Sequence, residues 1–177
     1  MAALQPLPSD REPIATASGK ASPRWRAWLQ RLDDYTRGLF GGQVPFPATQ
    51  NASTDPNTLD DYEEGRTTPT VTASTGTFTT VSATVDYTKV GRLVVCVASI
   101  VMTTAGTAAD ALLLPLPFTG RTGSIGSGAG REVASTGFAV TVTIPSAGTQ
   151  ATIYKYDNTT IIGSGRTVYV TFSYFTV

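Results

Sequence analysis

The sequence predicts a mainly β protein, an antiparallel β-sandwich or jelly roll that follows an extended arm and one N-terminal amphipathic helix. After residue 65 the chain is rich in Thr, Val, Ala, Ser and Gly, which favour strands and turns. Apolar and polar residues alternate there, most clearly in 138–144 and 167–175. Nine of the 13 acidic residues lie before residue 65, so the two parts of the chain differ in character.

Residues 1–21 predict an extended arm, because Pro6, Pro8 and Pro13 interrupt a stretch without hydrophobic periodicity. Each proline fixes its own φ angle and pushes the preceding residue out of the helical region. Two interpretations of this segment remain open. It is either a tail without fixed structure or an arm that becomes ordered along a partner protein.

A helix is predicted next, over residues 22–40. Ser22 is a preferred N-cap residue, and Pro23 suits the first helical position, where its missing N–H has no partner to lose. Gly41 and Gly42 then end the helix. We expect this to be the only helix of the chain.

The predicted helix carries an apolar stripe with the 3–4 spacing of a heptad seam, opposite an arginine-rich side. Its members are Trp25, Trp28, Leu29, Leu32, Tyr35 and Leu39. Burying each tryptophan is worth about 2–3 kcal/mol, and an isolated helix of this length is marginal in water. We therefore expect the stripe to be covered, either by its own domain or, as we favour, in a multichain bundle or against another protein. The second interpretation makes it the anchor and trimer interface.

Residues 43–64 predict a linker, stiffened by Pro45 and Pro47 and polar afterwards. The expected organisation is therefore an arm plus helix in 1–42, a linker in 43–64 and a β head in 65–177. A linker of this kind lets the two outer parts keep different orientations.

Short strands are expected throughout the head, separated by tight turns at 90–92 and 157–158. Residues 120–130 hold five glycines and predict a mobile loop. The expected strands are 68–74, 77–88, 92–103, 110–116, 131–135, 138–145, 150–156, 160–163 and 166–176.

Some of these strands look apolar or neutral on both faces. Residues 93–102 carry no charge, and the chain ends on Tyr174-Phe175-Thr176-Val177. A sheet with one face in water normally alternates more cleanly, and a large exposed apolar patch favours aggregation. Strands covered by identical subunits explain the pattern, so we expect a homotrimer.

The residue inventory argues against most chemistry. The chain has no histidine, so we expect no enzyme activity, no catalytic residues, no metal site and no cofactor. Cys96 lies within an apolar run and is interpreted as a buried hydrophobic residue. The 13 basic and 13 acidic residues leave no basic stripe for nucleic acid, and no apolar run is long enough for membrane insertion. Asp86 and Asp157 are interpreted as hairpin residues rather than as a glycosidase pair.

Tyr154 and Tyr156 are the candidate surface-contact residues of the head. They flank Lys155 on one predicted strand face, and aromatic rings stack on sugars and anchor protein interfaces. The same pattern also suits an ordinary half-buried strand, which is the interpretation we favour.

Three segments of the head carry a resemblance to a known class of proteins. They are Tyr62-Glu63-Glu64-Gly65 with Thr68-Pro69, the hairpin Tyr87-Thr88-Lys89-Val90-Gly91-Arg92, and Leu112 to Phe118 with its Pro-Leu-Pro-Phe end. Together they resemble the C-terminal β-domains of tailed-bacteriophage virion appendages, that is, tail fibres, spikes and head fibres. Arg66 and Thr67 depart from the pattern, because an aromatic residue is usual there. The N-terminal Gly-Lys-Ala-Ser-Pro-Arg-Trp stretch is similar to openings that anchor small phage appendages.

The resemblance implies a structural protein of the virion, assembled in the host cytoplasm. We expect a trimeric tail fibre or short spike, anchored by its N-terminus to other virion proteins such as a tail adaptor, nozzle or capsid. Its head would contact the host surface, including host glycans. The alternative is a capsid decoration or cement protein, or a head fibre, that stabilises the particle. A polysaccharide-cleaving spike is a third, disfavoured reading.

Overall fold

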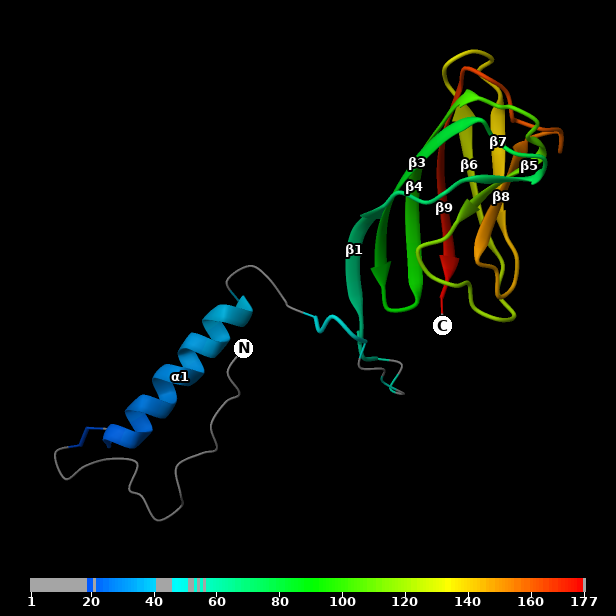
Figure 1. Cartoon of the computed structure of the whole chain (residues 1–177). Coiled ribbons are helices and arrows are strands. Elements are labelled where there is room, and N and C mark those ends of the chain that lie inside the picture. Colours follow the sequence, from blue (N-terminus) through cyan, green and yellow to red (C-terminus); the bar gives the residue numbers. More distant parts are fainter. Residues whose placement is uncertain are drawn as a thin grey trace. The chain divides into compact units, whose positions relative to one another are not determined.

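The computed structural model describes residues 19–20, 22–40, 46–50, 53, 55 and 57–176, with the side chains of 35–40 left aside. The chain forms two compact units, Met1–Phe46 and Pro47–Val177. The helix belongs to the first unit and all strands belong to the second (Figure 1). Residues 1–18 of the predicted arm lie outside the described residues.

Helix α1 spans Pro23–Phe40, so the predicted start and end are confirmed. The carbonyl of Ser22 accepts a hydrogen bond from the Arg26 N–H at 2.9 Å. Its Oγ accepts the N–H of Trp25 at 3.5 Å, as expected of an N-cap residue. The helix stops directly before Gly41, which lies outside the described residues.

Nine antiparallel strands make a single sheet in the order β1-β3-β4-β9-β6-β7-β8-β5-β2 (Figure 1). Their bounds are β1 Tyr62–Thr67, β2 Thr72–Thr75, β3 Thr80–Val90, β4 Leu93–Thr104, β5 Ala109–Pro115, β6 Gly126–Glu132, β7 Ala139–Ile144, β8 Gln150–Lys155 and β9 Arg166–Phe175. The mainly β, antiparallel prediction with one N-terminal helix is confirmed. The sandwich or jelly roll is corrected: the structure has one continuous curled sheet, a half-barrel.

The curl follows from where the first two strands pair. β1 pairs with the second half of β3, from Val85 to Val90. β2 comes next along the chain but pairs with β5, at the far end of the strand order. Residues 68–71 therefore bridge the two edges of the sheet and hold it curled.

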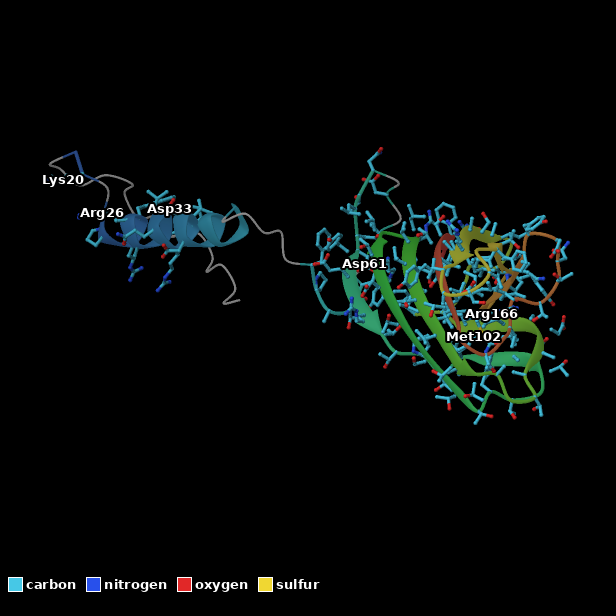
Figure 2. All side chains as sticks on the ribbon, turned by 90° about the horizontal axis from the view of Figure 1, so that it is seen from above. Lys20, Arg26, Asp33, Asp61, Met102 and Arg166 are labelled. Atoms are coloured by element: carbon cyan, nitrogen blue, oxygen red, sulfur yellow. The ribbon has the colours of Figure 1, made fainter. Side chains whose placement is uncertain are left out.

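The core lies on the concave face. Val168, Val170 and Phe172 of β9 are buried there, which confirms the face predicted from alternation. Cys96 is fully buried on the neighbouring strand β4, and burial raises its thiol pKa to about 12. The interpretation of Cys96 as a core residue is confirmed. Figure 2 marks Met102 and Arg166, which face each other where β4 and β9 pair.

The prediction of a loop over the glycine-rich segment 120–130 was wrong for its second half. Residues 126–132 form β6, which pairs with β7 on one side and β9 on the other. A Cβ on Gly128 would lie 2.3 Å from the Cβ of Phe172, and one on Gly130 would lie 2.0 Å from the Tyr169 carbonyl oxygen. These glycines allow close approach to the large side chains of β9 rather than mobility.

Other boundaries also moved. β1 begins at Tyr62, so residues 62–64 of the predicted linker belong to the sheet. The predicted strands 131–135 and 160–163 are absent from the described head, where β6 ends at Glu132. Ile161 and Ile162 are nevertheless buried: they belong to an irregular segment and pack into the core. An apolar run predicts that a segment is buried, but it does not decide whether that segment is a strand or an irregular stretch of chain.

Candidate functional site

The three segments that carry the resemblance meet around Tyr87. The Tyr87 hydroxyl donates a hydrogen bond to the Glu63 carboxylate at 2.6 Å. Gly65 lies opposite Tyr87 in the β1–β3 register, and a Cβ there would sit 2.7 Å from the Tyr87 hydroxyl oxygen. The ring of Phe118 packs edge-on against Tyr87, with centroids 5.2 Å apart. Residues distant in sequence thus form one cluster at one end of the sheet.

An ion pair completes this cluster. Lys89 Nζ donates to the Asp61 carboxylate, and each side chain is only 8% exposed. Lys89 Nζ also lies 5.1 Å from the centroid of the Phe118 ring, within cation–π range. The Asp61 carbonyl accepts the Gly91 N–H at 2.8 Å, which fixes the β3–β4 turn to the segment before β1. Figure 2 shows Asp61 at the entrance to the sheet.

Tyr174 secures the same end from β9. Its hydroxyl donates to the Phe118 carbonyl at 3.0 Å, and it also lies 3.2 Å from the Phe118 N–H, from which it accepts. The hydrogen bond to Glu63, together with burial, raises the pKa of Tyr87 to about 12. Burial raises the pKa of Tyr174 as well, so both phenols are protonated donors at neutral pH. The hydrogen bonds, ring contacts and ion pair of this cluster join β1, β3, β9 and Phe118 at one end of the sheet.

Glu132 is a second buried charge, and sequence analysis missed it. Its carboxylate accepts the backbone N–H groups of Ala134, Ser135, Thr136 and Gly137, and that of Thr167 at the start of β9. Burial acts to raise the pKa of Glu132, but these hydrogen bonds outweigh it and hold the pKa well below its usual range. The residue ties the β6–β7 turn to β9. The residues next to Glu132 in the sequence form no pattern that predicts a buried carboxylate.

The apolar stripe of α1 is described as far as Asp34. Trp25 and Trp28 are half-buried, and their rings lie 5.9 Å apart at 72° in an edge-to-face arrangement. Leu32 is half-buried, whereas Leu29 is 47% exposed. The spacing thus places the two tryptophans in contact on one side of the helix, and the covering of the stripe by another chain stays a prediction. The side chains of Tyr35 and Leu39 lie outside the described residues.

Tyr154 and Tyr156 have different surroundings. The Tyr154 hydroxyl donates to Asp110 at 3.1 Å, and Ser74 donates to the same carboxylate at 2.8 Å. These bonds, that of Ser74 first, lower the pKa of Asp110. Tyr154 is half-buried, as the ordinary-strand interpretation expected, and Tyr156 follows β8 and is 66% exposed. Tyr156 is therefore the more accessible of the two candidate contact residues.

The two aspartates considered as an acid pair both have structural partners. Asp86 forms a bidentate pair with Arg66 on β1, with distances of 2.5 and 2.7 Å. Asp157 accepts the N–H and hydroxyl of Thr159 in the turn after β8. These hydrogen bonds lower the pKa of each aspartate. Neither aspartate is the hairpin residue predicted: Asp157 caps a turn after β8 that is not followed by a strand paired with β8, and Asp86 joins β3 to β1.

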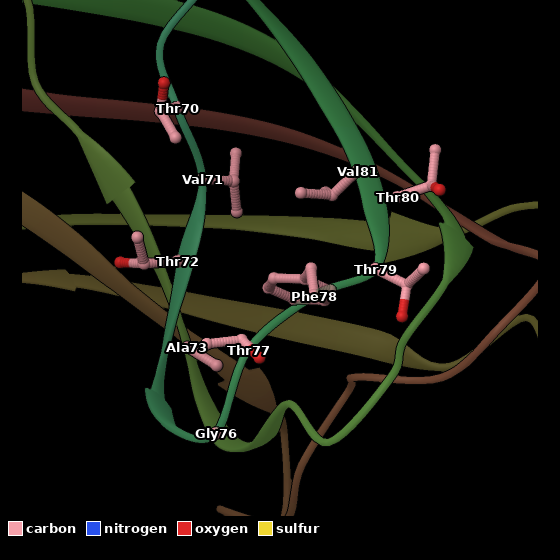
Figure 3. A pocket seen from close by; sticks show the side chains of 10 residues that line it. All are labelled: Thr70, Val71, Thr72, Ala73, Gly76, Thr77, Phe78, Thr79, Thr80 and Val81. Atoms are coloured by element: carbon pink, nitrogen blue, oxygen red, sulfur yellow. The ribbon is translucent and has the colours of Figure 1, made fainter.

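A pocket opens where the curl of the sheet is incomplete (Figure 3). It holds about 400 Å³ between β2 and the first half of β3. Residues 81–84 pair with β4 alone, so the sheet has a gap on their other side. Val71, Phe78 and Val81 line the pocket with several threonines and no charged side chain. Its chemistry suits an apolar side chain more than a polar ligand.

Comparison with protein-family models, curated proteins and solved structures finds no match to this chain. Within the described residues, no three His, Cys, Asp or Glu side chains gather as metal ligands would. The helix described here is not apolar enough over its length to cross a membrane.

Proposed function

We propose that this chain is a structural component of a phage virion, a homotrimeric tail fibre or short spike with an N-terminal anchor and a β head that contacts the host surface. The observation that carries the proposal is the cluster around Tyr87. The segments that resemble phage appendage domains lie at 62–65, 87–92 and 115–118, and they pack together at one end of the sheet. Because the three resembling segments contact one another, the resemblance concerns one part of the fold rather than three unrelated short matches.

The organisation of the chain supports the anchoring part of the proposal. The amphipathic helix belongs to a compact unit separate from the sheet. Its stripe of Trp25, Trp28, Leu29 and Leu32 has the spacing that helices use to pair with one another or to lie in a groove. In the proposal, this unit binds a tail adaptor, nozzle or capsid protein, and the head projects from it.

The head suits adhesion or structural reinforcement better than catalysis. The charged groups considered above are engaged in strand pairing, turn capping or closure of the sheet end. Tyr156 offers an exposed aromatic ring for a sugar or a protein. Host-surface glycan binding through this region is part of the proposal.

Copy number in purified particles of the encoding phage tests the proposal. A tail fibre or spike gives a few trimers per particle, as measured by quantitative gel densitometry against the major capsid protein. Copies in the range of the capsid protein would instead assign the chain to capsid decoration. Absence from purified particles would contradict both. Glycan-array binding by the full chain, reduced in Tyr156→Ala, would identify the contact surface.

A further inference from the structure

We propose that the convex face of β3, β4 and β9 is the surface through which copies of this chain assemble. The inference rests on the proposed homotrimer and specifies its interface. A row of apolar side chains crosses four adjacent strands, because the register pairs Tyr62 with Val90, Val90 with Leu93, and Leu93 with Phe175. All four are exposed, by between 39% for Leu93 and 47% for Phe175.

A second line of apolar residues runs along β4 from this row. Val94, Cys96, Ala98 and Ile100 point into the core, so the alternate residues Val95, Val97 and Val101 face outward. Val97 is 54% exposed. Tyr169 of β9 adds an exposed ring beside this line, opposite Ser99.

The apolar character of this face is strongest on β4, because the outward positions of β3 include Ser82, Thr84 and Thr88. On β7 and β8 the outward positions include Thr141, Thr143 and Thr152, which is the polar-out pattern of a strand that faces water. β4 departs from that pattern at four outward positions, Leu93, Val95, Val97 and Val101, with Ser99 between them. An exposed strand surface of this kind is an aggregation hazard unless something covers it.

A second copy of the chain fits this face better than a charged partner does. No charged residue faces outward on β4 or on β9 between Thr167 and Phe175. The charges lie at the margins of the face. Asp86 pairs there with Arg66, Glu64 lies on the same side of β1 as Tyr62, and Arg131 of β6 lies opposite Tyr169. Three copies of the uncharged strip formed by β4 and β9 can line a threefold axis without repulsion between like charges along it, whereas a nucleic acid or an acidic glycan finds no counter-charge on the strip.

The size of the face also suits self-association. Eight side chains, from Tyr62 on β1 to Phe175 on β9, expose on the order of 600 Å² of largely apolar surface. In a trimer this area divides between two neighbours, so it supplies the apolar centre of each contact rather than the whole of the roughly 800 Å² that a standard interface buries per partner. The Thr and Ser residues between them supply hydroxyls of the kind found in interface rims.

Thiol labelling of the full-length protein tests this face. Val97→Cys and Tyr156→Cys place thiols at two sites of similar exposure in the single chain, one on the proposed interface and one far along the strand order. In a sample that light scattering shows to be oligomeric, Val97→Cys should react with a maleimide at least about tenfold more slowly than Tyr156→Cys, because it reacts only when the interface opens. The unmodified chain supplies the background, since its own Cys96 is buried.

The outcomes separate the inference from the proposed function. Equal labelling rates in an oligomeric sample would overturn the interface while leaving a trimer held together elsewhere, such as through α1. A monomeric sample would contradict the homotrimer itself, and the interface with it. Val97→Lys provides a second readout in case the thiol variant assembles abnormally: it should reduce the oligomeric fraction, whereas Ile125→Lys, at a 74% exposed position outside the face, should not.

Discussion

Asp61 and Lys89 form an ion pair with only 8% of each side chain exposed, between the residue that precedes β1 and the penultimate residue of β3. A buried pair of this kind is not strongly stabilising in itself, but each charge depends on the other once both have left water. Lys89 also lies over the ring of Phe118, so the pair connects the start of β1, the end of β3 and the segment 115–118 in the cluster around Tyr87. The cluster around Tyr87 is therefore sensitive to the loss of either charge.

Lys89→Met should destabilise the head by about 3–5 kcal/mol, because it leaves the Asp61 carboxylate buried without a cation. Arg66→Met is the matched control, since it breaks an exposed pair on the neighbouring strands and should change stability little. Urea unfolding followed by far-UV circular dichroism measures both variants. Tryptophan fluorescence would not report on the head, because both tryptophans lie in α1. Equal effects of the two variants would show that Lys89 is not buried as described.

Glu132 should make the head sensitive to acid. Its pKa is lowered in the folded chain, so as pH falls the unfolded chain takes up a proton first. The stabilising contribution is therefore complete above the unfolded pKa of about 4.3 and is lost as pH falls below it. Glu132→Gln should cost at least about 2 kcal/mol at pH 7, because a neutral amide cannot accept all five backbone N–H groups.

The same variant should also flatten the pH dependence. Urea midpoints measured at pH 7 and pH 3 should differ less for Glu132→Gln than for the unmodified chain. Glu64→Gln, on the exposed outer side of β1, serves as the control and should retain the original dependence. A Glu132→Gln protein with the unmodified pH profile would contradict the assignment.

Gly128→Ala should destabilise the head strongly, because the added methyl would lie 2.3 Å from the Cβ of Phe172. Overpacking of this kind typically costs about 1–3 kcal/mol and more where backbone must move. Ala129→Ser, one residue along β6 and on the opposite face, should melt close to the unmodified protein. Thermal unfolding of the pair separates a close strand contact from a mobile loop, for which both changes would be neutral.

Trp28→Ala or Leu32→Asp should remove the protein from the particle, or break the trimer, while the head remains folded. The reason is that both residues lie on the stripe of α1, which belongs to a unit separate from the sheet. Immunoblots of purified particles and circular dichroism of the isolated protein give the two readouts. Arg31→Ala, on the charged side of the helix, is the control. Normal incorporation of the stripe variants would exclude the helix as the anchor.

The sequence allowed prediction of features with local causes. The helix begins at Ser22 and Pro23 and stops before Gly41, because capping and glycine act on adjacent residues. The inward face of β9 followed from the alternation of Val168, Val170 and Phe172, since a strand has a period of two.

Features that depend on distant partners could not be predicted in this way. Gly126, Gly128 and Gly130 suggest a loop when the sequence is considered alone. Their role in a strand follows only from the close approach of β9, which leaves no room for a Cβ. A single curled sheet and a two-sheet sandwich share the same strand pattern, and they differ only in pairings such as β6 with β9. Asp61 looks like an ordinary surface acid, because its partner Lys89 lies 28 residues away in the chain. Glu132 bonds mainly to the turn that follows it, and only its bond to Thr167, 35 residues away, links it to β9.

The mass of the full-length protein in solution, measured by light scattering at micromolar concentration, tests the central claim most directly. We expect three times the 18.6 kDa of one chain, with the convex face of β4 covered by identical copies. A stable, soluble species of 18.6 kDa would contradict it, because the apolar row from Tyr62 to Phe175 would then face water.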